Sequence, residues 1–203
     1  WVSRRFREEA NLLSQLQHPN IPRVRDFFQL EREGGTLCYI VMDFVQGVTL
    51  HHELEVALKA EKKGIDCALA RTIALEMLDV LGYLHSLIPP CVHRAIKLAN
   101  IIRDTENGKL FLVDFGLARG TSEHTQTTAG TLMFCPPEQM LGKADVRSDL
   151  YALGATLYLL LTGQPIQMGR YMPVLAHRGD IEPQLAETVD KVLQLDPDQR
   201  FQT

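Results

Sequence analysis

The sequence predicts an α+β fold, and three observations lead to this prediction. Two apolar, strand-like runs occur early in the chain, at residues 24–30 and 37–45. Most of the remaining apolar residues recur at helical spacing. A second pair of apolar runs flanks Asn107-Gly108, which is a strong signal for a tight hairpin turn. Because strands gather early and helices late, we expect a mostly helical C-terminal portion.

The elements follow in order from local signals. Apolar residues at helical spacing predict a first helix from Phe6 to Leu16, which stops at His18-Pro19-Asn20. The two strands 24–30 and 37–45 are expected to pair through a turn at Gly34-Gly35. Gly47 is expected to open the next helix, and Pro89-Pro90 ends the one after it. These two helices are predicted over residues 49–62 and 67–87, and two more over residues 148–162 and 185–195.

Composition excludes some classes of function. Of the 203 residues, 45% are hydrophobic and 23% charged, as in ordinary globular proteins. A net charge of −4 argues against a nucleic-acid partner. The most apolar run, residues 151–162, is too short to cross a bilayer, so no membrane segment is expected. The chain starts at Trp1 and both ends look cut, which suggests a piece of a longer protein.

The spacing of the cysteines indicates the cellular compartment of the protein. The chain has four, which are far apart and form no C-x-x-C pair: Cys38, Cys67, Cys91 and Cys135. Reduced thiols in a cytoplasmic protein are the favoured interpretation, and zinc or disulfides are a minor alternative.

Three polar residues suggest a site for phosphate chemistry. Asn100 precedes the first strand of the predicted second hairpin, and Asp114 follows its second strand. The turn brings them together, and converging hard oxygens suit Mg²⁺ carrying substrate phosphates. Lys97 adds a positive charge toward a transferring phosphoryl group. Taken singly, each is better read as a loop cap, a strand end or a solvated lysine, but the ordered set favours a site.

Three further stretches stand in order along the chain: His93-Arg94 with Asn100, Asp114-Phe115-Gly116, and Pro136-Pro137-Glu138. They match the motifs H-R-D-L-x-x-x-N, D-F-G and, with one departure, A-P-E. From Glu9 to Arg200 the chain therefore resembles the eukaryotic-like serine/threonine protein kinase catalytic domain. Lys97 resembles the serine/threonine branch of that family rather than the tyrosine branch.

The resemblance implies a two-lobed fold that is truncated at both ends. Residues 1–45 would be the remainder of the small lobe, with helix C, two antiparallel strands and the hinge, and residues 46–203 the mostly helical large lobe. Neither G-x-G-x-x-G nor V-A-I-K is present, so the family's first three strands lie outside this sequence. The implied partner is a protein substrate or a signalling protein.

The resemblance also implies roles for individual residues, with ATP and Mg²⁺ as cofactors. Glu9 matches the helix C glutamate, Met42 the gatekeeper, and the backbone of Asp43 and Val45 the hinge that binds adenine. The metal ligands are Asn100 and Asp114. The implied nucleotide site as a whole comprises Glu9, Met42, Asp43, Val45, Lys97, Asn100, Ile102 and Asp114.

Further matches concern architecture and regulation. Glu138 and Arg200 match a salt bridge of the large lobe, and Asp149 is placed to bond loop or helix-end amides. A stacked apolar column corresponds to Leu13, Val24, His93 and Phe115. Arg94 matches the cation that captures a phosphate of the activation segment, predicted at residues 117–135. The candidate phosphorylation sites are Ser122, Thr125, Thr127 and Thr128, with Thr131 assigned instead to substrate docking.

Ala95 is the main departure from the family pattern. The family has an aspartate there, which orients the substrate hydroxyl and accepts its proton. Alanine has no acceptor, and loss of a general base costs about 10²–10⁴ in rate. The change is natural, engineered or the result of drift, although the retained Asn100 and Asp114 argue against long drift. The sequence therefore predicts a strongly impaired kinase, with a pseudokinase or a purely structural interaction module as alternatives.

Overall fold

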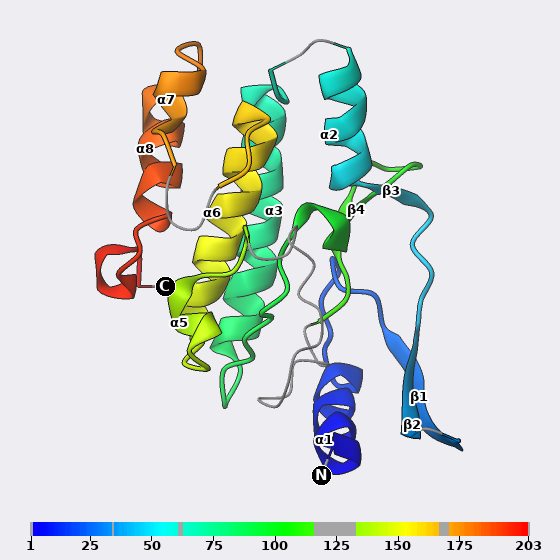
Figure 1. The fold of residues 1–203 in the computed structure, drawn as a ribbon. Coiled ribbons are helices and arrows are strands. Elements are labelled where there is room, and N and C mark those ends of the chain that lie inside the picture. Colours follow the sequence, from blue (N-terminus) through cyan, green and yellow to red (C-terminus); the bar gives the residue numbers. More distant parts are fainter. Residues whose placement is uncertain (1, 34, 61–62, 116–132, 167–170, 203) are drawn as a thin grey trace.

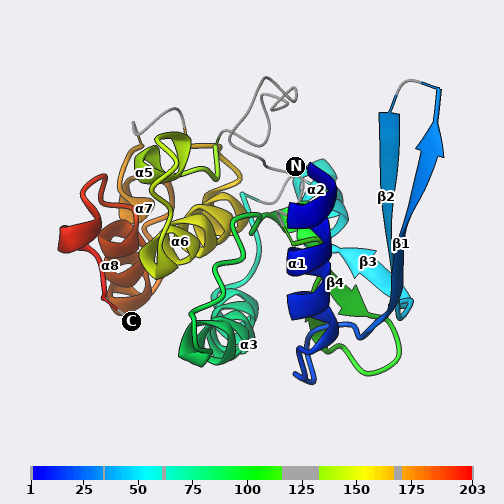
Figure 2. The same ribbon diagram turned by 90° about the horizontal axis from the view of Figure 1, so that it is seen from below.

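A computed structural model describes residues 2–33, 35–60, 63–115, 133–166 and 171–202, with side chains from residue 6 onward. The fold is α+β, as predicted (Figure 1). A helix and a two-stranded hairpin lie on one side, and most of the helices lie on the other (Figure 2). In the described part of the chain, no helix is both long and apolar enough to span a membrane.

The first helix and hairpin form where the sequence predicts them. Helix α1 spans Val2–Ser14, and the antiparallel strands are β1 (Val24–Arg32) and β2 (Gly35–Met42). Phe6 of α1 contacts Phe27 of β1 edge-on, with ring centroids 6.4 Å apart. The predicted end of the second strand at Val45 is wrong. Strand β2 ends at Met42, the next backbone bond runs from Asp43 N to Arg23 O just before β1, and residues 44–46 belong to no strand of the described chain.

The predicted helix at residues 49–62 is also corrected. Residues Gly47–Thr49 form a short strand, β3, that pairs with β4 (Ile101–Asp104), and helix α2 spans Leu50–Lys59. Gly47 serves this strand rather than the helix, because a Cβ there would lie 2.2 Å from the Arg103 carbonyl oxygen. The hydroxyl of Thr49 then caps α2 by accepting a hydrogen bond from His52 N.

Two long helices form the centre of the helical part. Helix α3 spans Cys67–Ser86, and α6 spans Val146–Thr162. A capping box between Asp145 and Ser148 starts α6 two residues before its predicted beginning. Helix α8 (Pro183–Val192) packs against α6 (Figure 1). The short elements are α5 (Pro137–Met140), α7 (Val174–His177) and two 3₁₀ turns at Leu98–Asn100 and Pro197–Gln199.

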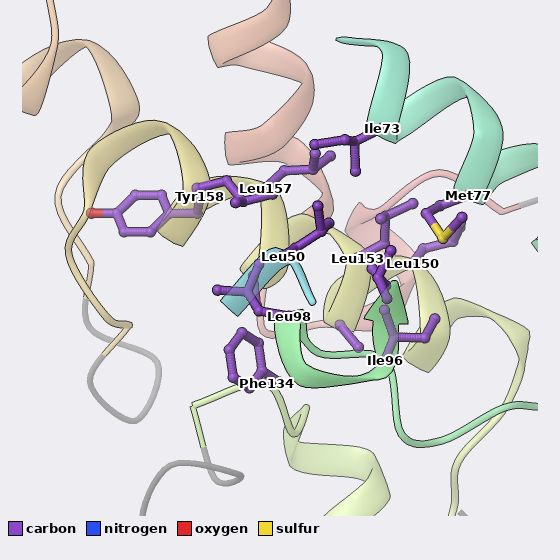
Figure 3. Packing of buried hydrophobic residues seen from close by; sticks show 14 of the residues in the cluster. Leu50, Ile73, Met77, Ile96, Leu98, Phe134, Leu150, Leu153, Leu157 and Tyr158 are labelled. Atoms are coloured by element: carbon purple, nitrogen blue, oxygen red, sulfur yellow. The ribbon is translucent and has the colours of Figure 1, made fainter. Parts of the chain in front are cut away.

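The core fixes the loop that precedes the second hairpin. Ile96 and Leu98 belong to this loop and are 2% and 1% exposed. Figure 3 shows them in one cluster with Leu50 of α2 and with Leu150 and Leu153 of α6. Because burial of a leucine or isoleucine side chain contributes about 1.5–3 kcal/mol, these two residues anchor the polar residues between and around them.

Candidate functional site

The second hairpin brings Asn100 and Asp114 together, as predicted. Strands β4 and β5 (Leu110–Leu112) pair antiparallel, from Ile101 opposite Leu112 to Arg103 opposite Leu110. Gly108 adopts a φ of 73°, which suits glycine in the turn. At the open end of the hairpin, Val113 N donates to Asn100 O over 2.9 Å. The two predicted metal ligands therefore flank the same end of the hairpin.

The side chain of Asn100 is buried and oriented. Its Nδ2 donates to the backbone oxygens of Ala95 (2.8 Å) and Asp114 (3.3 Å). Its Oδ1 accepts no hydrogen bond from the described residues, and the side chain of Asp114 is exposed. An amide oxygen and a carboxylate from two residues in contact through Asn100 Nδ2 and Asp114 O are thus available, and this donor set fits a divalent cation that also binds phosphate oxygens. In the described part of the chain, no group of three or more His, Cys, Asp or Glu residues is placed to hold a metal ion.

A buried carboxylate shapes the loop around Ala95. Asp149 of α6 is 0% exposed and accepts hydrogen bonds from the backbone N of His93 and of Arg94, each over 2.8 Å. This confirms the prediction that Asp149 bonds loop amides. Its Oδ2 also lies 3.0 Å from Nε2 of His85. Arg94 adopts a φ of 64°, an uncommon conformation for a residue with a side chain, and the bonds to Asp149 stabilise this backbone next to Ala95.

His93 points into the core. It is 1% exposed, and its ring centroid lies 4.3 Å from that of Phe115. Leu13 belongs to the hydrophobic core, and Val24 and Phe115 pack against that core, while the stacking of all four residues in one column stays a prediction. Burial lowers the pKa of His93 to about 4, despite the opposing influence of Asp149 and Asp114. His93 is therefore neutral and sequestered, and it cannot replace the carboxylate that is missing at residue 95.

The burial of His93 predicts a pH-dependent loss of stability. Its pKa falls from 6.5 to about 4 on folding, so the unfolded chain gains a proton that the folded chain excludes. Stability should therefore fall as the pH drops through 6.5 and level off near 4, by about 2 kcal/mol between pH 7.5 and pH 5.0. Urea unfolding at both pH values measures this loss. In the His93→Phe variant, most of this difference in unfolding free energy between the two pH values should disappear. If the difference is unchanged, other titratable groups cause it.

The residues predicted to bind adenine lie on and beside the segment between β2 and β3. Met42 ends β2, and Ile102 lies on β4 opposite Thr49. The backbone N of Asp43 is already used by Arg23 O at 2.9 Å, and its carboxylate pairs with Arg25. The N–H of Val45 makes no hydrogen bond within the described part of the chain, so it is free to donate to a ligand. Glu9 lies on α1 and is partly buried.

The predicted pair of Glu138 and Arg200 is confirmed. Nη1 and Nη2 of Arg200 lie 2.7 Å and 3.1 Å from the two carboxylate oxygens of Glu138, and the arginine side chain is 0% exposed. Ser148 Oγ adds a hydrogen bond of 2.8 Å to the same carboxylate. Burial alone would raise the pKa of Glu138, but the hydrogen bonds from Arg200 and Ser148 outweigh it and lower that pKa.

A network of polar contacts around Asn20 could not be predicted from the sequence. Asn20 Nδ2 donates to Glu76 of α3 (3.1 Å) and to Leu110 O (2.7 Å), while Leu110 N donates to the same Glu76 carboxylate (3.0 Å). Leu112 N in turn donates to Asn20 O. This network fastens β5 to α3 and to the segment after α1. The only local signal was the stretch His18-Pro19-Asn20, which we interpreted as a helix stop.

Most of the predicted activation segment lies outside the residues that the structure describes. Ser122, Thr125, Thr127, Thr128 and Thr131 lie outside the described residues. Arg94, the predicted phosphate-binding cation, forms no ion pair with any described residue, and its Nε is buried without a hydrogen-bond partner among them. Phosphorylation of this segment stays a prediction.

Comparisons with known proteins agree with this geometry. A family model described as the protein kinase domain matches residues 2–203. Serine/threonine-protein kinase PknB of Mycolicibacterium smegmatis is 36% identical over 223 residues, which cover 98% of this chain and 34% of that protein. PknB of Mycobacterium tuberculosis is 33% identical over 221 residues, with the same coverage. The chain thus spans about a third of the length of these curated relatives.

Solved structures show the same similarity. A crystal structure of a mutant of the Mycobacterium tuberculosis PknI kinase domain superposes with a TM-score of 0.79 at 26% identity. The match covers all of this chain and 74% of that one. A double mutant of the same domain gives a TM-score of 0.77.

Proposed function

Because the chain belongs to the serine/threonine protein kinase family, we propose that it is part of a kinase domain that binds ATP with Mg²⁺ but transfers phosphate poorly. The observation that carries this proposal is the pairing of Asn100 and Asp114 at one hairpin end, beside a loop in which Ala95 replaces the acid. Residues 1–45 would belong to the small lobe and hinge, and residues 46–203 to the large lobe. The cytoplasmic location stays a prediction.

Each polar residue has a specific task in this proposal. Asn100 and Asp114 hold Mg²⁺, which when bound neutralises charge on the phosphate oxygens. The fit is supported by the free Oδ1 of Asn100 and the exposed carboxylate of Asp114. Lys97 is partly buried, makes no ion pair with described residues, and adds positive charge toward the transferring phosphoryl group.

The adenine end of the nucleotide is assigned to the segment after β2. The Val45 N–H donates and the Asp43 carbonyl accepts, since the Asp43 N–H is already bonded to Arg23 O. Met42 and Ile102 supply apolar contact from β2 and β4. Glu9 orients the ATP-anchoring lysine of the family, which is not in this sequence.

In this proposal, Ala95 is the reason why phosphoryl transfer is slow. The loop around it has its backbone held by Asp149 and by Asn100, so the position is well formed but carries no proton acceptor. Asn100 and Asp114 are committed to the metal, and His93 is buried. The substrate in this proposal is a serine or threonine hydroxyl of a protein.

A pseudokinase is the second candidate, because metal ligands persist beside the missing acid. Such a protein binds nucleotide and signals to a partner through its conformation. A third candidate, a purely structural interaction module, would not bind nucleotide at all. Nucleotide binding separates the third candidate from the other two, and phosphoryl transfer separates the first from the second.

Substitution of Asp114 tests the nucleotide site. In the full-length protein, Asp114→Ala should weaken Mg²⁺-dependent ATP binding at least tenfold, because a ligand of the metal is lost. Titration calorimetry with and without Mg²⁺ measures this effect. Glu187→Ala removes an exposed carboxylate on α8 and is the matched control, which should leave binding unchanged. Equal affinity in the two variants would refute the metal assignment.

A further inference from the structure

A small pocket opens beside Ala95, on the loop that precedes β4. It contains about 240 Å³ of empty space, including the part open to solvent, which is below the roughly 300 Å³ at which pockets for small-molecule ligands begin. A group that enters the pocket must therefore be small. The described residues that line it are Arg94, Ala95, Ile96, Lys97, Phe134, Cys135 and Gln139.

The pocket holds a cation without a matching anion. None of the described residues that line it carries a carboxylate, because alanine stands at residue 95. Lys97 lines the same pocket and takes part in no ion pair among the described residues. The backbone next to Ala95 already has its partners, since Arg94 N donates to Asp149 and Arg94 O accepts from Gln139. An incoming group therefore meets an ammonium ion beside the place of a missing carboxyl group.

The apolar part of the lining adds to the attraction for a small anion. Ile96 and Phe134 are 2% and 9% exposed, so little water reaches that wall of the pocket. Opposite charges beside such a wall are screened less than in bulk water. The ligand that fits is a small carboxylate, because its charge complements Lys97 and its size equals that of the group that alanine lacks.

We propose that this pocket binds a small carboxylate, which then acts as the general base that residue 95 does not supply. The inference rests on the proposed function, which makes residue 95 the position of the proton acceptor. As the oxygen of the substrate hydroxyl bonds to the γ-phosphorus of ATP, the bond to ADP breaks and the hydroxyl proton passes to the bound carboxylate. The carboxylic acid that forms loses this proton to water, so the ligand is not consumed.

Two sources can present this carboxylate. One is a free small anion such as formate, which consists of a carboxylate group and one hydrogen. The other is an aspartate or glutamate side chain of the protein substrate, close to the hydroxyl that receives the phosphate. In the second case the missing acid at residue 95 would also set substrate specificity, because only substrates with a nearby carboxylate would complete the site.

The first measurement is phosphoryl transfer by the full-length protein in formate, compared with chloride at the same ionic strength. Transfer by the parent should rise at least about tenfold and saturate, because a bound base recovers part of the contribution of a general base. Ala95→Asp supplies its own carboxylate and should not respond. Benzoate is too large for the pocket and should not replace formate. No response of the parent, or equal responses to formate and benzoate, would overturn the proposal.

Paired peptides separate the two sources without added formate. One peptide has glutamate next to the serine that is phosphorylated, and the other has glutamine there. If the substrate supplies the base, the parent should prefer the glutamate peptide by at least about tenfold, and Ala95→Asp should lose this preference. A response to formate without such a preference assigns the pocket to a free carboxylate.

The second measurement needs neither ATP nor activity. Cys135 lines the pocket and is partly exposed, so a bound ligand should slow alkylation of its thiol by iodoacetamide. In the parent, formate should slow it about twofold at half-saturation of the pocket, and Ala95→Asp and Lys97→Gln should show no protection. Lys59→Gln removes an exposed lysine of α2 outside the pocket and should behave like the parent. The exposed Cys38 of β2 is the unprotected reference, and mass spectrometry follows both thiols.

The two measurements keep this inference apart from the proposed function. Absence of protection in the parent, or equal protection in Ala95→Asp, would overturn the carboxylate site. Protection of Cys135 without formate-dependent transfer, in protein that binds ATP, would overturn the role of the carboxylate as base. If the protein does not bind ATP with Mg²⁺, the proposed function fails, and alkylation alone decides whether the pocket binds a carboxylate.

Discussion

Ala95→Asp is expected to raise phosphoryl transfer by the full-length protein by about 10²–10⁴, the usual contribution of a general base. Hydrogen bonds already hold the backbone of the loop around residue 95. Its backbone is held by the buried carboxylate of Asp149, and Asn100 Nδ2 donates to the carbonyl oxygen of Ala95. Ala95 is partly exposed, so a carboxylate there need not be buried unpaired. Transfer of labelled phosphate from ATP to a mixed protein substrate measures the gain.

A nearby alanine provides the control for this gain. Ala99 lies in the 3₁₀ turn of the same loop and is exposed, so Ala99→Asp adds the same charge at a position without the proposed role. We expect its transfer rate to equal that of the parent. Equal rates in Ala95→Asp and Ala99→Asp would show that residue 95 is not the position of the proton acceptor.

Arg200→Ala is expected to destabilise the protein by about 3–5 kcal/mol, because it leaves the Glu138 carboxylate largely buried without its cation. The variant also loses stabilising contacts other than the ion pair with Glu138. The guanidinium also donates to the backbone oxygens of Arg147, Gln194 and Leu195, and it lies over the ring of Tyr151 at 4.8 Å. One arginine thus joins α5, α6 and the segment after α8. Urea unfolding at pH 7.5 measures the change.

An exposed ion pair of the same chain is the comparison. Arg71 pairs with Glu182, and the two side chains are 55% and 46% exposed. Exposed pairs contribute about 0–1 kcal/mol, so Arg71→Ala should cost little. If Arg200→Ala costs no more than Arg71→Ala, the buried pair does not stabilise the fold as its geometry implies.

Elements with strong local signals could be predicted from the sequence. The hairpin at Asn107-Gly108 and the helix that ends before Pro89-Pro90 both formed, because turn residues and proline act through their immediate neighbours. The strand at Gly47 could not be predicted. Its partner is near Arg103, more than fifty residues later, and only that pairing gives the glycine its role. Distant pairing leaves no trace in a local pattern.

In the candidate site, too, contacts set by local sequence could be predicted and contacts between distant segments could not. The proximity of Asn100 and Asp114 could be predicted, because a short hairpin joins them, while their role as metal ligands stays a prediction. The contact between Glu138 and Arg200 followed from the family resemblance and not from any local rule. The bonds of Asn20 to Glu76 and of His85 to Asp149 were missed, since they join segments 56 and 64 residues apart through single side chains. Such contacts depend on how the helices pack.

The most direct test of this account follows γ-labelled ATP in one experiment on the full-length parent with Mg²⁺ and a mixed protein substrate. Nucleotide bound to the protein and label transferred to substrate are measured in the same samples. The account predicts Mg²⁺-dependent binding of intact ATP, with label transfer at least about 10² slower than in Ala95→Asp. Transfer as fast as in Ala95→Asp, or no Mg²⁺-dependent binding of ATP at all, would contradict it.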